Sequence, residues 1–232
     1  MPIPRAYHHG TVRATAIRIG LDAARTGGPS AVTVREISRR IGVSPNAVYR
    51  HFEDRDELVV AVALASQDKL AAAMREMIAS LTAGLSGPDA AVARLRGVGL
   101  GYITFALAEP GWFELALVTF DPAYGSARPT VTVAAQVPAP FALLLDALDE
   151  CVATNAMAPS AREGAEWACW SAVHGFADIA TRGPLQGADV AALTAMGGAV
   201  VDSIIAGVGI TTPRHSTPRH PTQPLAPAVR ID

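Results

Sequence analysis

The sequence predicts an all-α fold in which a small N-terminal three-helix unit is joined by one long helix to a larger helical body. Apolar residues recur at the three- and four-residue spacing of a helix face through most of the 232 residues. Alanine is frequent and runs of β-branched residues are short, which disfavours strands. Half of the residues are hydrophobic and 17% are charged, the composition of a compact globular chain with one large or two small domains.

The first helix is expected to begin near Gly10, after a loose arm formed by residues 1–9. It should end at Gly27-Gly28-Pro29, because glycine and proline favour the end of a helix over its continuation. One face of this helix carries the apolar residues Val12, Ala16, Ile19 and Ala23.

Residues 32–58 contain two short helical patterns, one on either side of Gly42. The first pattern places three apolar residues on one face: Val34, Ile37 and Ile41. Gly42 can end that helix in the left-handed conformation. Ser44 is expected to cap the second helix, with Pro45 at its first position and its end near His51. A helix of two turns is marginal alone, so a larger body must support it.

This arrangement is a helix-turn-helix, whose second helix enters the major groove of DNA. Asn46 can pair with adenine and the methyl group of Ala47 can contact thymine, while Tyr49 can reach a phosphate. The DNA-binding residues predicted from the motif are Thr33, Val34, Arg35, Ser44, Pro45, Asn46, Ala47, Tyr49, Arg50, His51 and Arg55. The alternative is a plain αα-hairpin with a solvated basic face, which the Gly-x-Ser-Pro punctuation and the Tyr-x-His-Phe ending disfavour.

The N-terminal unit is basic and the remainder of the chain is acidic. Residues 1–55 contain nine arginines and four acidic residues, a net charge of +5, although the whole chain has a net charge of −2. A basic head on an acidic body is the electrostatic pattern of a nucleic-acid-binding domain, so double-stranded DNA is the expected partner. The N-terminal arm either reaches phosphates or the minor groove, or is a disordered end.

The run from Thr33 to Leu58 resembles the DNA-binding half of the TetR, or tetracycline-repressor-like, regulators. Gly42-Val43-Ser44, Tyr49-Arg50-His51-Phe52 and the acid-rich stretch that follows carry the resemblance. It implies a homodimeric repressor that is released from a palindromic operator by a small molecule, and it does not indicate which molecule. Arg55 stands where members usually carry lysine, which implies a phosphate contact.

The long linking helix is expected over residues 54–81, where Asp54 can cap the N-terminus. At 1.5 Å per residue it is on the order of 40 Å long, and the resemblance implies that it transmits ligand binding to the head. Further helices are expected over 89–109, 131–157, 161–181 and 188–208, with a short apolar stretch at 112–118 and a loop at 119–129. The predicted domains are a DNA-binding domain over 1–55, a ligand-binding and dimerisation domain over 56–210, and a disordered proline-rich tail over 211–232.

The last two helices are the expected dimer surface. Small residues crowd together in residues 188–208, and each interior glycine costs about 1 kcal/mol of helix propensity, which close packing against another helix would offset. Two copies would form a four-helix interface and place the recognition helices roughly 34–36 Å apart. Burial of these helices within one monomer is the alternative.

The middle helices carry long or aromatic side chains with few charges, which predicts a pocket for a small hydrophobic or aromatic effector. The candidates are Met74, Met77, Tyr102, Phe105, Trp112, Phe113, Phe120, Phe141, Leu145, Trp170 and His174. The run Trp170-Ser-Ala-Val-His174-Gly175 resembles the Trp-His-Gly signature of one group of TetR C-terminal domains. The stripe that includes Trp170 and His174 can instead be plain core. A DNA-binding regulator without a small-molecule effector is the alternative function.

The remaining motifs indicate neither catalysis nor a cofactor. Gly97-Val-Gly-Leu-Gly101 lies inside a helical pattern with no preceding strand, unlike a dinucleotide-binding loop. Cys151 and Cys169 have neither a disulfide framework nor metal-ligand spacing, so no metal is expected. The N-terminus lacks the apolar core of a signal peptide, which predicts a cytoplasmic protein. Residues 190–210 are apolar enough to suggest a membrane span, but Asp202 near the middle disfavours it.

Overall fold

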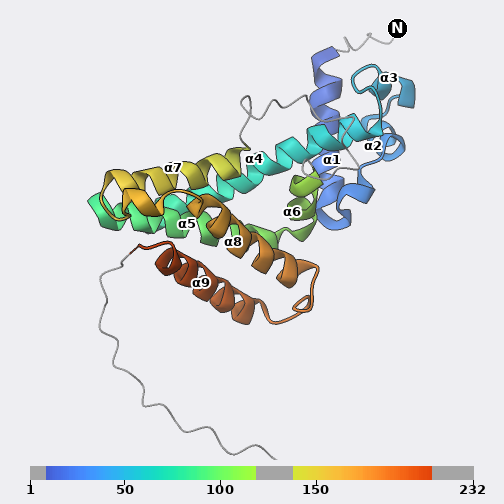
Figure 1. Cartoon of the computed structure of the whole chain (residues 1–232). Coiled ribbons are helices and arrows are strands. Elements are labelled where there is room, and N and C mark those ends of the chain that lie inside the picture. Colours follow the sequence, from blue (N-terminus) through green and yellow to red (C-terminus); the bar gives the residue numbers. More distant parts are fainter. Residues whose placement is uncertain (1–8, 119–137, 211–232) are drawn as a thin grey trace, which may run out of the picture.

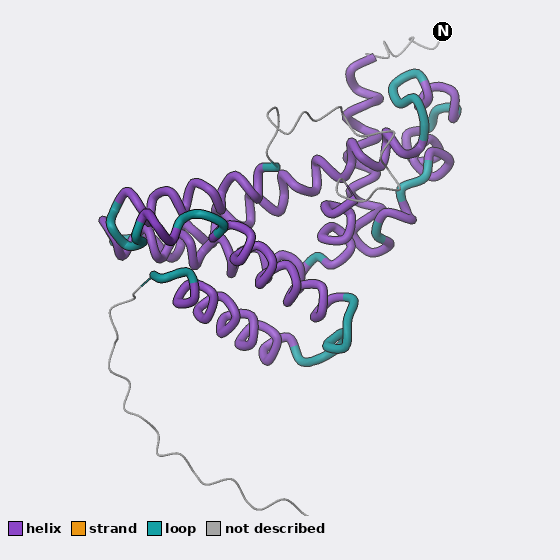
Figure 2. Tube along the Cα trace, in the orientation of Figure 1, coloured by secondary structure: helices purple, strands orange, loops and turns teal. Residues whose placement is uncertain are grey.

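The computed structural model describes residues 9–118 and 138–210, and the regular elements in these ranges are all helices (Figures 1 and 2). The predicted all-α fold is therefore confirmed. The predicted N-terminal arm, the loop over 119–129 with Phe120, and the tail over 211–232 lie outside the described residues, apart from His9 at the start of the first helix.

The N-terminal head consists of α1 (His9–Gly27), the short 3-10 helix η1 (Pro29–Ala31), α2 (Val34–Ile41) and α3 (Pro45–Tyr49). Gly42 has φ 82°, and the backbone N–H groups of Gly42 and Val43 both donate to the carbonyl of Ser38, so the predicted glycine end of α2 is confirmed. The second helix is shorter than expected. The N–H of His51 donates to the carbonyl of Val48 at 2.9 Å, a three-residue step that tightens the last turn.

The helix α4 (Arg55–Thr82) belongs to both parts of the molecule (Figure 1). Its N-terminus is capped as predicted, with a carboxylate oxygen of Asp54 accepting from the N–H of Glu57 at 2.8 Å. Leu58 and Val62, near its start, are buried in the head core, whereas Leu70 and Met74, farther along, are buried in the core of the body. One continuous helix therefore connects the two cores.

The body adds α5 (Gly87–Ala108), α6 (Pro110–Leu117), α7 (Ala139–Ala153), the 3-10 helix η4 (Pro159–Ala161), α8 (Ala165–Thr181) and α9 (Val190–Gly207). The helices α4, α5 and α7 pack alongside one another, and α8 and α9 pack against each other and against α5 (Figure 1). The short helix α6 lies between the body and α1 of the head.

The glycines of the run from Gly97 to Gly101 serve helix packing. A methyl group placed on Gly97 would lie 2.8 Å from the Cα atom of Ile78, and one on Gly101 would lie 2.7 Å from the Cα atom of Met74. Since real Cβ atoms do not approach a backbone this closely, both positions allow α5 to touch the backbone of α4.

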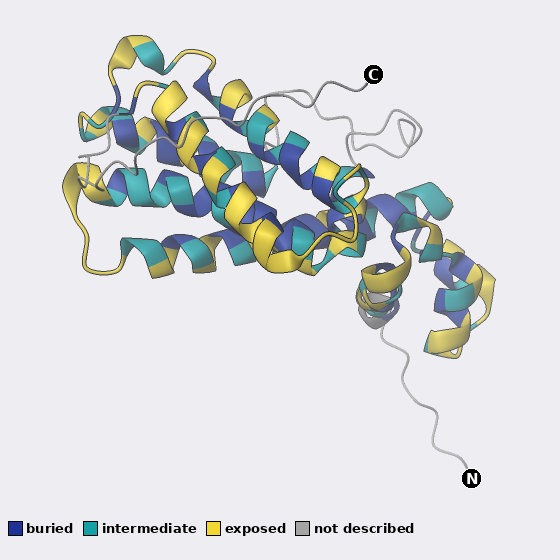
Figure 3. Ribbon diagram, turned by 90° about the horizontal axis from the view of Figure 1, so that it is seen from below, coloured by how far each residue is buried: buried dark blue, intermediate teal, exposed yellow. Residues whose placement is uncertain are grey.

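Among the described helices, α5 and α9 are long and apolar enough to cross a membrane by length and composition alone. More than half of the apolar window of α5 is buried, as in a core helix of a soluble protein. Only 22% of the apolar window of α9 is buried, so this helix presents an exposed face (Figure 3). These two weakly apolar helices do not indicate a membrane protein.

Candidate nucleic-acid interface and internal pocket

The helix α3 stands on the head with most of its side chains exposed. Val48 and Phe52 are almost completely buried and fix the helix and the turn after it to the head core. Ser44, Pro45, Asn46, Tyr49 and Arg50 are exposed, and Ala47 and His51 are half-buried. Seven of the predicted DNA-binding residues therefore share one surface around α3.

The start of α2 adds Thr33 and Arg35 to the candidate interface. Thr33 is the N-cap of α2, and its hydroxyl accepts from the N–H of Glu36 at 3.3 Å. The Arg35 side chain is exposed. Val34, in contrast, is only 6% exposed and packs in the head core, so its side chain is removed from the predicted interface. The apolar spacing of Val34, Ile37 and Ile41 predicts this burial, so it describes Val34 better than the DNA-binding motif does.

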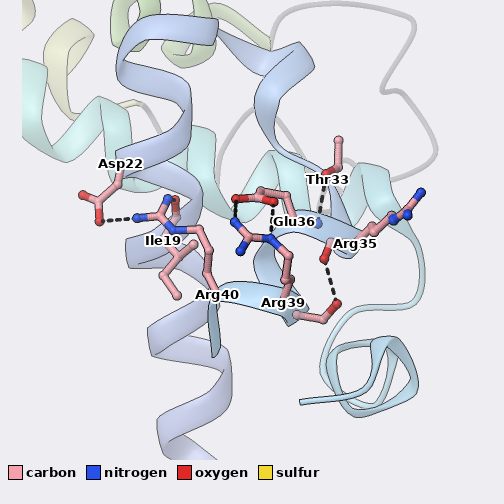
Figure 4. A network of polar contacts seen from close by, with 8 residues as sticks. Ile19, Asp22, Thr33, Arg35, Glu36, Arg39 and Arg40 are labelled. Carbon is pink, nitrogen blue, oxygen red and sulfur yellow. Dashed lines mark hydrogen bonds and ion pairs between the residues drawn. The ribbon is translucent and has the colours of Figure 1, made fainter. Parts of the chain in front are cut away.

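Acidic side chains already hold some of the arginines of the head (Figure 4). Arg39 forms a two-bond fork with Glu36 at 2.9 and 2.7 Å, and Arg40 lies 3.8 Å from Asp22. Within residues 9–118 and 138–210, no ion pair holds the guanidinium groups of Arg35 and Arg50. Figure 4 shows the Arg35 side chain directed away from the Glu36–Arg39 pair. Arg35 and Arg50 are therefore the cations best placed for phosphates.

Arg55 has a structural role that the family resemblance did not indicate. Its Nε atom donates to the carbonyl of Val32 at 3.2 Å, and its Nη2 atom donates to the carbonyl of Pro29 at 3.0 Å. Its third nitrogen lies 3.5 Å from Asp56. These contacts tie the start of α4 to the segment before α2, so Arg55 has a role in the scaffold, and its phosphate contact stays a prediction.

An apolar cavity lies in the body between α4, α5, α7, α8 and α9. The space open to the centre of a water-sized sphere is about 20 Å³. Its walls are hydrocarbon and aromatic groups, together with one thiol and one glycine. The lining residues are Met74, Leu95, Val98, Gly99, Tyr102, Pro140, Leu144, Cys169, Trp170, Val173, Val201, Ile204 and Ile205.

The predicted pocket residues separate into three groups. Met74, Tyr102 and Trp170 line the cavity. Phe113, Phe141 and His174 form an aromatic cluster next to it, and each has a ring contact with Tyr102 or Trp170. Five others are not part of the lining: Met77 and Leu145, which are half-buried, Phe105 and Trp112, which lie near the junction with the head, and Phe120, which is outside the described residues.

The sequence missed the contribution of α9 and the correct face of α7. Leu144 lines the cavity in place of the predicted Leu145, because adjacent residues of a helix point in directions about 100° apart. Val201, Ile204 and Ile205 of α9 also line it, at the spacing of one helix face. This apolar spacing is visible in the sequence. The spacing alone does not indicate whether the face packs against a pocket or against a partner chain.

Tyr102 and His174 form the polar pair closest to the cavity. The Tyr102 hydroxyl and Nδ1 of His174 are 2.9 Å apart, and the Trp170 ring stacks on the imidazole at a centroid distance of 6.1 Å. Burial raises the pKa of Tyr102 far above its usual range and lowers the pKa of His174. A protonated tyrosine and a neutral histidine make the hydroxyl the donor and Nδ1 the acceptor, which assigns the ring proton of His174 to Nε2.

The short helix α6 joins the head to the body through Trp112. The indole N–H of Trp112 donates to the carbonyl of Leu21 in α1 at 2.7 Å, and the Trp112 carbonyl accepts from the hydroxyl of Ser66 in α4 at 2.8 Å. The charged ends of Arg25 and Lys69 lie over the indole, 5.1 and 4.7 Å from a ring centroid. Trp112 of α6 therefore contacts α1, which belongs to the head, and α4, which joins the head to the body.

Arg25 and Gly111 strengthen this junction. Arg25 at the end of α1 forms a fork with the carboxylate of Glu109, with N–O distances of 2.7 and 2.5 Å. A methyl group on Gly111 would lie 2.3 Å from the carbonyl oxygen of Ala24, so only glycine allows α6 to approach α1 this closely.

The fold and the exposed helix on its basic head define the class of helix-turn-helix DNA-binding proteins with a helical second domain. Two family models match the chain. The model described as bacterial regulatory proteins of the tetR family matches residues 17–62, and the model described as the tetracyclin repressor-like C-terminal domain matches residues 95–201. The chain belongs to the TetR family, and it is a transcriptional regulator with a DNA-binding domain. Regulators of this family bind DNA, dimerise and are typically not enzymes.

Solved structures show the same fold. A Rhodococcus protein of unknown function is 24% identical, with a TM-score of 0.65 over 88% of this chain and 98% of its own. A protein from Mesorhizobium loti described as a TetR-family transcriptional regulator is 14% identical, with a TM-score of 0.63 over 86% of this chain and 98% of its own. No curated protein sequence matches the chain significantly. The resemblance to the Trp-His-Gly group remains a prediction.

Proposed function

We propose that the protein is a ligand-responsive repressor. A cytoplasmic homodimer binds a palindromic operator and leaves it when a small hydrophobic or aromatic molecule binds between the helices of the body. The observation that carries the proposal is the course of α4, which is part of both the head core and the wall of the apolar cavity.

The operator is read by the surface around α3. Asn46 and Ala47 contact base edges in the major groove, and Tyr49 and Arg50 contact phosphates on either side. The proposed DNA-binding residues are Thr33, Arg35, Ser44, Pro45, Asn46, Ala47, Tyr49, Arg50 and His51. These positions are supported by their exposure and by the packing that holds α3 in place.

The effector acts through Met74. This side chain is 1% exposed and lines the cavity, four turns of α4 beyond Leu58 and Val59 of the head core. A ligand that displaces Met74 tilts α4 and changes the separation of the two heads. Such a ligand shifts the equilibrium only if it binds the two head separations with different affinity.

The outer faces of α8 and α9 are proposed as the dimer surface. Trp167 is 62% exposed, Val190 is 64% exposed and Met196 is 45% exposed, although all three are large apolar residues. Contact between the same faces of two copies would bury these groups in a symmetric interface.

A regulator without a small-molecule effector is a second candidate, and the small free volume of the cavity favours it. About 20 Å³ admits little more than one water-sized sphere, whereas typical ligand pockets are several hundred Å³. The first candidate therefore requires the walls to move when the effector binds.

The test is selection of genomic DNA fragments by the purified protein, repeated with Asn46→Ala and Tyr49→Ala and with an apolar metabolite extract. Asn46→Ala should relax base preference at one position of each half-site by about 1–3 kcal/mol. Tyr49→Ala should instead weaken binding to all sequences. The extract should release the bound fragments.

Unchanged sequence preference of Asn46→Ala would show that Asn46 does not read a base. If extracts that contain the organism's apolar metabolites never release the DNA, the regulator without an effector becomes the better description. Absence of preference for any duplex over random competitor, even at low ionic strength, would contradict the whole proposal.

A further inference from the structure

The cavity has one wall that the proposed function does not use, the inner face of α9. Val201, Ile204 and Ile205 of this helix line the cavity. Val201 is 1% exposed and sits over Gly99 of α5, which also lines the cavity. A methyl group on Gly99 would lie 2.9 Å from one methyl carbon of Val201 and 3.2 Å from the other. Gly99 is therefore the notch into which Val201 fits.

We propose that the contact between Gly99 and Val201 sets the largest effector that the pocket accepts, and that this effector is a neutral, apolar ring compound. The proposal rests on the ligand-responsive function proposed above. It adds the size-determining residues and narrows the ligand class to neutral rings.

The α9 wall is the one best able to move. The opposite wall is rigid, because Gly97 and Gly101 bring the α5 backbone into contact with α4. Only 22% of the apolar window of α9 is buried within the described residues. The ion pair between Arg96 and Asp202, with N–O distances of 2.7 and 3.2 Å, ties α9 to α5. Because these side chains are 37% and 56% exposed, their pairing contributes little. At the cavity, the restraint on α9 is the fit of Val201 into the Gly99 notch, whereas nearer the start of α9 Gly197 packs closely on Ile103 and Phe176.

The lining determines the class of ligand. Among the described residues, no charged side chain lines the cavity. Burial raises the pKa of the Cys169 thiol to about 11, so this group is also neutral. The Tyr102 hydroxyl is already hydrogen-bonded to His174. A charged ligand would lose its hydration without gaining a partner, whereas a ring can contact Tyr102 and Trp170 at their faces or edges.

The test measures binding of N-phenyl-1-naphthylamine to the full chain by fluorescence, with benzene and naphthalene as competitors. Val201→Ala removes two methyl groups from the notch. The matched control, Val200→Ala, removes the same groups from the preceding residue, which packs on the core but does not line the cavity. We expect Val201→Ala to raise the affinity for naphthalene relative to benzene about tenfold, and Val200→Ala to leave this ratio unchanged.

Gly99→Ala and the double variant test the contact itself. Gly99→Ala should lower the naphthalene-to-benzene affinity ratio about tenfold, because the added methyl group takes up space beside Val201. In the double variant the new methyl group occupies the space that Val201→Ala vacates, so the ratio should return toward the wild-type value. Such non-additivity is the signature of a direct contact. Should Gly99→Ala fail to fold, the comparison of Val201→Ala with Val200→Ala still decides the proposal.

A wild-type ratio in Val201→Ala, or an equal change of the ratio in Val201→Ala and Val200→Ala, overturns the size-determining contact. Probe binding by all variants would still leave the proposed effector pocket intact. Binding of no probe by any folded variant, with DNA binding retained, contradicts the effector pocket itself and this inference with it. Preference for a charged analogue such as naphthoate over naphthalene contradicts the ligand class.

Discussion

At the scale of single residues, the charges of the head differ in their availability to DNA. The sequence shows nine arginines in residues 1–55, but not which of them are already paired. Arg40 approaches Asp22, and Arg25 pairs with Glu109, across separations in the chain that no local pattern reveals. Arg35 and Arg50 have no ion pair within the described residues, so they can each replace a phosphate counterion.

The matched substitutions Arg35→Gln and Arg39→Gln test this distinction. Each condensed counterion released on binding contributes about 0.9 to the slope of log affinity against log salt concentration. Arg35→Gln should therefore reduce the magnitude of the slope by about 0.9 for each half-site. Arg39→Gln should change the slope much less, because Glu36 already holds Arg39. The measurement is operator binding over a series of salt concentrations. Equal changes in the two variants would show that the Glu36–Arg39 pair opens on DNA.

The side chains whose places the sequence does not predict share one physical cause. Helix periodicity identifies a buried face, and this correctly places Val34 and Val48 toward the head core. It does not identify which buried groups meet at a cavity, so the pattern predicts Leu145, whereas Leu144 lines the space. A charged side chain such as Arg55 has no periodic signal for its partners, which are backbone carbonyls more than twenty residues earlier.

At the scale of elements, α6 is the feature that the sequence described least well. Residues 112–118 were expected to form only a short apolar stretch, and most of the stretch is helical, as part of α6. Its function as a junction depends on partners 91 and 46 residues away from Trp112, and no local pattern encodes these contacts. The long helices, in contrast, were predictable because their caps and apolar repeats are local: Asp54 caps α4 as expected.

Trp112→Phe tests the junction between head and body. Phenylalanine retains an aromatic ring for Arg25 and Lys69, but it loses the N–H group that donates to the Leu21 carbonyl. The free energy of unfolding should fall by about 1 kcal/mol, the net value of one hydrogen bond plus a small loss of packing. The measurement is urea denaturation, with Tyr49→Phe as the control. Tyr49 is 47% exposed and lies outside the proposed dimer surface, so loss of its hydroxyl should have almost no effect on the free energy of unfolding. An equal loss in both variants would show that the Leu21 contact is not stabilising.

At the scale of the whole molecule, the chain has a basic head, an apolar pocket and an unpartnered apolar face on α8 and α9. The sequence predicted these three parts, because charge, composition and periodicity are properties of whole segments. It did not predict that α9 has two distinct apolar faces, with Val201 directed to the cavity and Ala199 exposed on the other side. If the exposed side meets a second copy, any movement of α9 that enlarges the pocket also changes the interface. Effector binding and dimer geometry are then coupled through one helix.

The dimer surface is tested by Ala199→Glu, which places a carboxylate in the centre of the exposed face of α9. In a symmetric interface, the new carboxylate would be buried close to the same carboxylate of the second copy. Burying two like charges close together is strongly unfavourable. The variant should sediment as a monomer. It should bind the operator about a hundredfold more weakly, because the second half-site contact is no longer held at high local concentration.

Ala72→Glu makes the same change at an exposed position of α4 and should remain a dimer with unchanged operator affinity. A dimeric Ala199→Glu protein with normal operator affinity would place the interface elsewhere. Monomeric Ala72→Glu would place it on α4, and the exposed face of α9 would then need another explanation.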